Sequence, residues 1–277
     1  MPNDQRVAIV TGAGRGIGRA MTLGLLAVGI RVLGVDRDRA PLDELTDLAA
    51  QRQAGTGLAT MQADLAHEPV IAEILAATLQ RFGRVDILVN NAGIGQGIIR
   101  ADNWSNPIRF WEVEPAQWQL FVAVHSTAPF LLSRLVAPLL VEQGWGRIVN
   151  VTTSLGTMTR GGYAAYGPTK AATEAMTSVM AYDLEGSGVT ANVLVPGGVT
   201  NTNIVPAESG FDRAKMLQPE IMAPPLQYLV SDAANGVSGQ RFLAAHWDPS
   251  LPPAEAAAKA GAPGAWRSIA TLPIVPQ

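Results

Sequence analysis

Short apolar runs alternate with helical patterns along most of this chain. Apolar, β-branched runs predict seven strands, at 6–11, 31–36, 57–62, 85–90, 147–152, 190–195 and 240–245. The stretches between them predict helices at 17–28, 41–53, 68–82, 115–141 and 164–185. Strands that are apolar throughout need cover on both faces, so the pattern predicts an α/β fold with a mostly parallel sheet flanked by helices.

Three segments exceed what such a fold requires. They are an insertion at about 95–113, a loop at about 198–225 and an Ala/Pro-rich tail at about 247–277. The tail could form a short helix on a neighbouring subunit, cover the crevice at the strand ends, or fray. Neither a linker nor an internal repeat divides the chain, so we expect a single domain over 1–277.

Composition narrows the classes of function. The net charge of −3 gives no reason to expect a nucleic-acid or anionic-membrane partner. The chain has no cysteine, which excludes disulfides and thiolate catalysis and suits a cytoplasmic protein. We expect a soluble protein, with no apolar run of the ~18 residues that a membrane span needs and no signal peptide.

A glycine-rich turn follows the first predicted strand. Gly12, Gly16 and Gly18 stand where a strand ends and a helix begins. Glycines let the backbone approach a pyrophosphate, and the helix N-terminus offers free amides and a partial positive charge. Many such turns bind nothing, so the turn alone could be either a pyrophosphate site or a plain turn.

Asp36 ends the second predicted strand, 18 residues beyond Gly18. A carboxylate there can accept both hydroxyls of an adenosine ribose and would repel a 2′-phosphate, which favours NAD over NADP. The neighbouring arginines could instead approach a 2′-phosphate or remain solvated; they are Arg15, Arg37 and Arg39.

Two further strand ends carry polar or small residues. Asp64 could cap a helix or accept from an adenine amino group. The run from Asn90 to Gly93 could let a ribose or nicotinamide lie against the backbone, although asparagine pairs at strand ends are usually turn formers.

Tyr166 and Lys170 lie four residues apart on a predicted helix and therefore share one face. A lysine ammonium can stabilise tyrosinate and lower a phenol pKa that starts near ~10. Such a tyrosine can exchange a proton with an alcohol oxygen while a nicotinamide exchanges hydride.

Taken together, these motifs resemble the short-chain dehydrogenase/reductase family. They are Thr11 to Gly18, Asp64, Asn90 to Gly93, Tyr166-x-x-x-Lys170 and Pro196 to Val199, in the family's order. The resemblance implies a doubly wound Rossmann fold with a seven-stranded sheet, a nicotinamide cofactor and alcohol–carbonyl interconversion. It also implies homotetramers or homodimers formed through the helices at 115–141 and 164–185.

The resemblance also implies roles for single residues. Tyr166 would be the general acid/base, Lys170 would bind the nicotinamide ribose, and Asp36, with Arg37 beside it, would face the adenosine ribose. The other implied cofactor positions are Gly12, Arg15, Gly16, Ile17 and Gly18 at the turn, Asp64 and Leu65 at the adenine, Asn90, Asn91, Ala92 and Gly93 along the ribose, and Pro196, Gly197, Val199 and Thr202 at the carboxamide.

Two positions depart from the family pattern. Thr153 stands where the family has its active-site serine, and Ser154 would take that role if the loop were shifted by one residue. His125 replaces an asparagine that holds a water linked to the lysine. Histidine could relay protons itself, or it could merely fill the position. His67 and His246 lack partners at metal-ligand spacing, so we expect no catalytic metal.

The substrate side offers weaker signals. Trp104, Phe110 and Trp111 of the insertion could border the crevice or pack the insertion onto the body. We expect Met158, Met216 and Met222 near the same crevice and Tyr163 in its wall, which suits a secondary alcohol/ketone pair with apolar substituents. Arg160 and Arg213 are the basic candidates for binding an anionic group. Alternatives are a dinucleotide-binding sensor or scaffold, or chemistry on C=N or C=C bonds.

Overall fold

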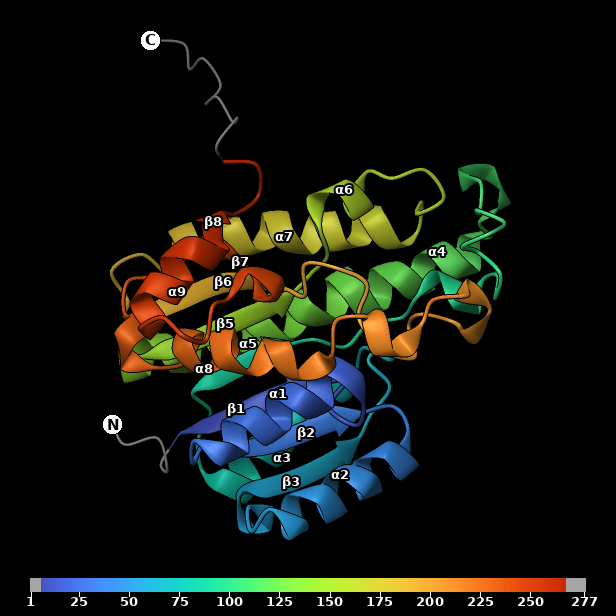
Figure 1. Ribbon diagram of the computed structural model, residues 1–277. Coiled ribbons are helices and arrows are strands. Elements are labelled where there is room, and N and C mark those ends of the chain that lie inside the picture. Colours follow the sequence, from blue (N-terminus) through green and yellow to red (C-terminus); the bar gives the residue numbers. More distant parts are fainter. Residues whose placement is uncertain (1–5, 268–277) are drawn as a thin grey trace.

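One sheet of eight strands organises the molecule (Figure 1). The computed structural model describes residues 6–267. The strand order is β3-β2-β1-β4-β5-β6-β7-β8, and every neighbouring pair is parallel except the antiparallel β7 and β8. The strands are β1 (Val7–Thr11), β2 (Arg31–Asp36), β3 (Leu58–Gln62), β4 (Ile87–Asn90), β5 (Gly146–Val151), β6 (Val189–Val195), β7 (Gln240–Leu243) and β8 (Gly261–Pro263). The α/β prediction is confirmed, with one strand more than the seven expected.

Helices cover both faces of this sheet, because the side chains of each strand alternate between two buried cores. In β1, Ala8 and Val10 point into one core and Ile9 into the other. The first core packs against α1 (Gly16–Ala27), α2 (Arg39–Gln51) and α8 (Ala223–Leu229). The second packs against α3 (Val70–Phe82), α5 (Ala128–Gln143) and α7 (Tyr166–Asp183).

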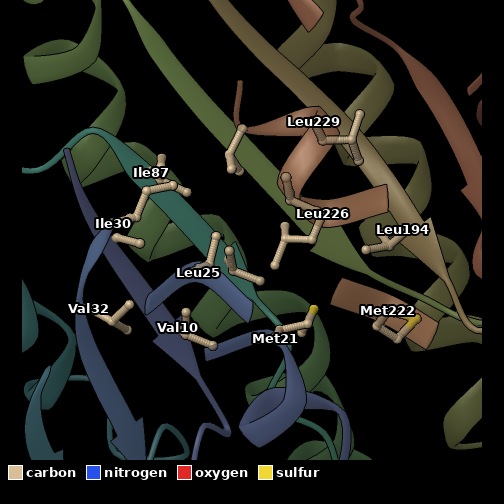
Figure 2. Close-up of a cluster of buried hydrophobic side chains, with 14 of the residues drawn as sticks. Val10, Met21, Leu25, Ile30, Val32, Ile87, Leu194, Met222, Leu226 and Leu229 are labelled. Carbon is tan, nitrogen blue, oxygen red and sulfur yellow. The ribbon is translucent and has the colours of Figure 1, made fainter. Parts of the chain in front are cut away.

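The first core is continuous beneath two helices that lie far apart in sequence. Figure 2 shows Met21 and Leu25 of α1 near Leu226 of α8, over side chains from the central strands. Leu25 and Leu226 are fully buried. Burial of such a side chain stabilises the fold by roughly 1.5–3 kcal/mol. This core therefore holds α1 and α8 against the central strands.

Strand order reverses at β1, which lies between β2 and β4. The connections that leave β1 and β4 therefore diverge at the carboxyl ends of these strands. In open α/β sheets that divergence creates the ligand crevice. The glycine turn and the segment after Asn90 lie at this position.

The helix predicted at 115–141 is interrupted. It consists of α4 (Pro115–Val122), a π-helical turn (Ala123–Thr127) and α5. Pro129 has no N–H to donate to the carbonyl of residue 125, and the His125 carbonyl accepts from the Thr173 hydroxyl instead. The π turn thus follows from a proline and places His125 at its centre.

Contrary to the sequence-based expectation, one helical stretch in the described part of the chain is long and apolar enough to span a membrane. It is Pro115–Gln143, within which an 18-residue window has a mean hydropathy of 1.5. Its α5 portion packs on α3, α7 and β5. Leu132, Val136 and Leu140 are fully buried there, so the stretch serves as a core helix of this fold.

The tail forms the short helix that was one of its three predicted courses, and this helix packs on the chain itself. It forms α9 (Pro253–Ala260) and β8, and α9 packs on the chain's own α8 and β7. Small buried alanines, among them Ala256 and Ala260, allow this close approach. Residues 268–277 of the predicted tail lie outside the described residues.

Candidate active site

Two adjoining clefts open at the carboxyl ends of the central strands. The larger has a volume of about 510 Å³, and the smaller has a volume of about 280 Å³. The predicted residues that line the larger cleft are Gly12, Arg15, Gly16, Ile17, Gly18, Asp36, Arg37, Asp64, Leu65, Asn91, Ala92, Gly93 and Thr202. Those that line the smaller are Thr153, Ser154, Tyr166, Lys170, Pro196, Gly197 and Val199, and Ile17, Asn91 and Thr202 border both.

The glycine turn has the geometry that a pyrophosphate cradle needs. Gly12 and Gly16 have φ values of +64° and +51°, which L side chains rarely adopt. A Cβ on Gly18 would lie 1.9 Å from the carbonyl oxygen of Gly12, so only glycine fits there. The turn residues present therefore fit a dinucleotide, whose phosphates the N-terminus of α1 would face.

Asp36 faces the larger cleft and is held by the backbone. Its carboxylate accepts from the N–H of Gly14 at 2.9 Å and of Asp38 at 3.2 Å. Arg15 and Arg37 both pair with Asp38, and Arg39 pairs with Asp43 outside the cleft. The three arginines therefore have carboxylate partners, and two aspartates stand at this end of the cleft.

Asp64 lines the same end of the cleft and also accepts from the N–H of Ala66 at 3.0 Å. Asp64 can therefore form its turn and face a ligand at the same time.

The two asparagines at the end of β4 point to different sides. Asn91 borders both clefts, and its side-chain amide donates to the Thr11 carbonyl at 2.9 Å. The expected contact of Asn90 with the ribose stays a prediction for its backbone alone, because of where its side chain lies. That side chain is buried beneath the cleft and donates to Asn150 at 2.8 Å, joining β4 to β5. Alternation along a strand explains the difference, since consecutive side chains point to opposite faces.

Tyr166 opens α7 beside the smaller cleft. Burial raises the pKa of its phenol to about 12, against a lowering contribution from its hydrogen bond with Thr153. The expectation of an acidified phenol is therefore wrong for the protein alone, because desolvation of the tyrosinate outweighs that hydrogen bond.

Lys170 lies one turn further along α7 and is buried. Its ammonium group donates to the carbonyl of Val151 at 3.0 Å, and burial lowers the pKa of Lys170 to about 8. Lys170 therefore links α7 to the end of β5.

The contacts favour Thr153 over Ser154 in the place of the family serine. The Thr153 hydroxyl is hydrogen-bonded to Tyr166. The Ser154 hydroxyl is bonded instead to Thr157 at 2.8 Å. Ser154 borders the cleft but is engaged in the turn that starts α6 (Leu155–Met158).

His125 is buried behind the cleft, with both ring nitrogens occupied. The N–H of Ile94 donates to its Nε2 at 3.0 Å, and Nδ1 lies 3.0 Å from the Thr169 hydroxyl. Because Nε2 accepts, the ring proton resides on Nδ1. Burial, followed by the charge of Lys170, holds the pKa of His125 well below its usual value. These contacts suit a neutral linker between the β4 loop and α7 better than a proton relay.

The sequence analysis did not identify one buried ion pair near the site. Glu174 and Arg241 form a buried ion pair at 2.9 Å behind the cleft. Glu174 also accepts from the Thr152 hydroxyl at 2.9 Å, and Arg241 donates to the Thr153 carbonyl at 3.1 Å. Since Glu174 is four residues beyond Lys170, helical spacing could have indicated that it shares the catalytic face.

The substrate-side aromatics divide into two groups. Trp104 lines the smaller cleft and packs edge-on against Tyr163 and Phe211. Phe110 and Trp111 are 73% and 70% exposed and pack on each other, so they neither border the cleft nor anchor the insertion.

The three methionines expected at the crevice do not line it. Met158, Met216 and Met222 are buried in the body. The apolar wall instead contains Val199, Ile204 and Val205 from the loop that follows β6. Arg213 clamps this loop by donating to the carbonyls of Thr202 and Val205.

Within residues 6–267, no group of three or more His, Asp or Glu side chains is arranged to hold a metal ion. His67 and His246 are exposed.

The sequence and the fold are similar to those of known proteins. A family model described as short chain dehydrogenase matches residues 6–210. A 3-oxoacyl-[acyl-carrier-protein] reductase from Synechocystis is 32% identical over 86% of this chain and 94% of its own length. A solved structure from Beutenbergia cavernae, assigned as an NAD(P)-dependent gluconate 5-dehydrogenase with NADP at low occupancy, is 32% identical with a TM-score of 0.75, over 86% and 94% of the two chains. A metagenomic short-chain oxidoreductase in complex with NADP is 28% identical with a TM-score of 0.68, over 82% and 90%.

Proposed function

This chain belongs to the short-chain dehydrogenase family and is an NAD(P)-dependent oxidoreductase, and we propose that it interconverts a secondary alcohol and a ketone by hydride transfer. One observation carries the proposal. Tyr166, Lys170 and Thr153 meet in a cleft that shares its border residues with the dinucleotide cleft. A carbonyl carbon there would lie between the cofactor's hydride and a proton donor.

The residues divide the work as follows in the reducing direction. The Thr153 hydroxyl donates a hydrogen bond to the substrate oxygen, and Tyr166 gives that oxygen a proton. Lys170 would bind the ribose hydroxyls of the cofactor and would stabilise the tyrosinate that results. The nicotinamide supplies hydride when reduced and, when oxidised, carries positive charge that favours tyrosinate.

Other residues hold the dinucleotide in this proposal. Gly12, Gly16 and Gly18 let the pyrophosphate approach the amides of α1. Asp64 and Leu65 border the adenine, and Val199 and Thr202 meet the carboxamide.

We favour NAD as the cofactor of this chain. Asp36 would accept the ribose hydroxyls and repel a 2′-phosphate, and Arg15 and Arg37 are already paired with Asp38. Two similar structures hold NADP, so both cofactors must be compared.

The substrate proposed is a small molecule with an apolar body. Trp104, Ile204 and Val205 give the smaller cleft an apolar side, and its volume of about 280 Å³ is at the low end for small-molecule sites. A cytoplasmic location and self-association as a dimer or tetramer belong to the same proposal. They rest on the cysteine-free composition and on the apolar exposed faces of α5 and α7.

The test is consumption of NADH and of NADPH with a panel of ketones, since the relative from Synechocystis is named as a reductase of an oxo group. We expect turnover, faster with NADH. Dinucleotide binding without turnover of any ketone would favour the sensor interpretation instead.

A further inference from the structure

The smaller cleft carries positive charge with no acid to balance it. Lys170 and Arg160 line it, and neither aspartate nor glutamate is among its lining residues. The larger cleft differs, because Asp36, Asp38 and Glu208 line it and Arg15 pairs with one of them. The imbalance is therefore local to the side where the substrate reacts.

Arg160 is the accessible cation of this cleft. Its guanidinium forms neither a salt bridge nor a hydrogen bond with any residue in the range 6–267. Its neighbours are the rings of Tyr163 and Trp104, at 5.5 Å and 6.0 Å from the ring centroids. A ring contacts the face of a guanidinium, so the in-plane N–H donors remain available.

The loop that carries Arg160 is fastened to the cleft by a second polar residue. The Gln96 side-chain amide donates to the carbonyl of Gly162, two residues beyond Arg160. Gln96 is 4% exposed and lines the cleft. Its Oε1 is buried and has no hydrogen-bond partner among the described residues. A buried acceptor without a donor is costly, so this wall suits a ligand that brings one.

The other candidate for anion binding has no free donors of this kind. Arg213 donates to Asn201, Thr202 and Val205 and closes the loop after β6. Arg160 thus differs from Arg213, Arg15 and Arg37 in having its guanidinium unengaged at the rim of the reacting cleft.

We propose that the substrate is a short oxo acid or hydroxy acid whose carboxylate pairs with Arg160, and that a hydroxyl on a carbon other than the reacting one, in substrates that carry it, donates to Gln96 Oε1. The inference rests on the proposed alcohol–ketone chemistry and adds the specificity determinant. One planar guanidinium matches the two oxygens of a carboxylate. The apolar side of the cleft receives the rest of the molecule.

The experiment compares acids with neutral molecules of the same skeleton. Pyruvate, acetoacetate and levulinate are assayed beside their methyl esters, with the preferred dinucleotide, on the wild type and Arg160→Gln. We expect the wild type to favour at least one acid over its ester by about tenfold or more in kcat/KM. In Arg160→Gln that preference is lost through KM, so that kcat/KM falls more for the acids than for their esters.

Two further variants sharpen the result. Arg160→Lys keeps the positive charge but lacks the paired N–H donors of a guanidinium, so it should retain part of the preference for acids over esters. Arg52→Gln, at an exposed arginine where α2 ends and away from both clefts, should behave as the wild type. An acid-to-ester ratio that is the same in the wild type and Arg160→Gln overturns the proposal.

A binding measurement separates this proposal from the proposed function. Calorimetric titration with benzoate, benzamide and phenyl phosphate, in the presence of dinucleotide, measures binding affinity without turnover. Benzoate binding that weakens about tenfold or more in Arg160→Gln supports the anion site even if no ketone is reduced. Equal benzoate affinity in both proteins overturns it, as does a marked preference for phenyl phosphate over benzoate, which would assign a phosphate ester.

Discussion

Loss of contact with water sets the charge state of three side chains around the reacting cleft. Burial raises the pKa of Tyr166 to about 12 and lowers that of Lys170 to about 8. Burial also holds His125 in its neutral form. Near neutral pH, Tyr166 therefore retains its proton and Lys170 is charged, which suits a site poised to protonate a carbonyl oxygen.

His125 should make the fold sensitive to acid. Its pKa is lowered in the folded protein, whereas the unfolded chain titrates near ~6.5, so the unfolded state binds more protons as the pH falls below that value. The free energy of unfolding should fall from pH 7 to pH 5 more steeply in the wild type than in His125→Asn, by up to about 1.4 kcal/mol per pH unit. Urea unfolding at several pH values checks this, and parallel curves would contradict it.

The same substitution tests the proton path. If His125 only links the β4 loop to α7, His125→Asn should leave the pH–rate profile unchanged in shape. A shifted profile would restore the relay hypothesis.

Asp36 should control the choice of cofactor. Asp36→Asn removes the charge that opposes a 2′-phosphate but keeps an acceptor for the N–H of Gly14. Like charges in contact cost several kcal/mol, so kcat/KM for NADPH relative to NADH should rise about tenfold or more. Asp43→Asn, on the exposed face of α2, is the matched control. An unchanged ratio would show that Asp36 does not face the ribose.

At the scale of single residues, the sequence predicts those features that depend only on neighbouring positions in the chain. The glycine turn is one, since a strand, a tight turn and a helix follow each other directly. The buried side chain of Asn90 and the raised pKa of Tyr166 were not predicted, because both depend on what packs around them. The pairing of Glu174 with Arg241 joins residues 67 positions apart, and spacing alone cannot place β7 behind α7.

At the scale of elements, the end of β5 is held from two sides. From α7, Lys170 donates to the carbonyl of Val151, and Glu174 accepts from the hydroxyl of Thr152. From β7, Arg241 donates to the carbonyl of Thr153. The position of the Thr153 hydroxyl therefore depends on three elements together.

Breaking the Glu174–Arg241 pair should cost both stability and activity. Glu174→Gln leaves the guanidinium of Arg241 buried without its counter-charge, and such changes cost about 3–5 kcal/mol. We expect kcat to fall as well, because the Thr153 backbone loses its support. The double variant Glu174→Gln/Arg241→Met should recover most of the stability. Equal unfolding free energies of the wild type and Glu174→Gln would contradict the account.

Long elements were predicted well because their periodic pattern is strong. The strands β1 to β7 and the helices α1, α2, α3 and α7 lie within a few residues of their expected bounds, whereas the helix expected at 115–141 is divided into α4, the π turn and α5. The π turn and β8 were not predicted, and a short tail helix such as α9 was expected only as one of three courses. The π turn depends on Pro129 and on Thr173 of another helix, and a three-residue strand such as β8 exists only through its pairing with β7.

At the scale of the whole molecule, the outer faces of α5 and α7 remain apolar. Phe130 and Val179 are 47% and 57% exposed, and the two helices pack beside each other. Exposed apolar side chains on adjacent helices fit the proposed contact with a second copy of the chain.

Charges placed on this face should therefore lower the mass of the particle. Phe130→Glu/Val179→Glu should shift light-scattering mass from a dimer or tetramer towards a single chain. Leu79→Glu, at an exposed leucine of α3, is the matched control and should leave the mass unchanged. A wild type that already has the mass of one chain would contradict the prediction.

The most direct test of the account is Tyr166→Phe, which deletes one hydroxyl from the reacting cleft. We predict that NAD(P)H consumption falls at least about a hundredfold, in line with the loss of a general acid. The affinity for dinucleotide, measured by fluorescence titration, should remain within about twofold, because the larger cleft is lined without Tyr166. Unchanged turnover would contradict the assignment of Tyr166 as the proton donor and with it the proposed mechanism.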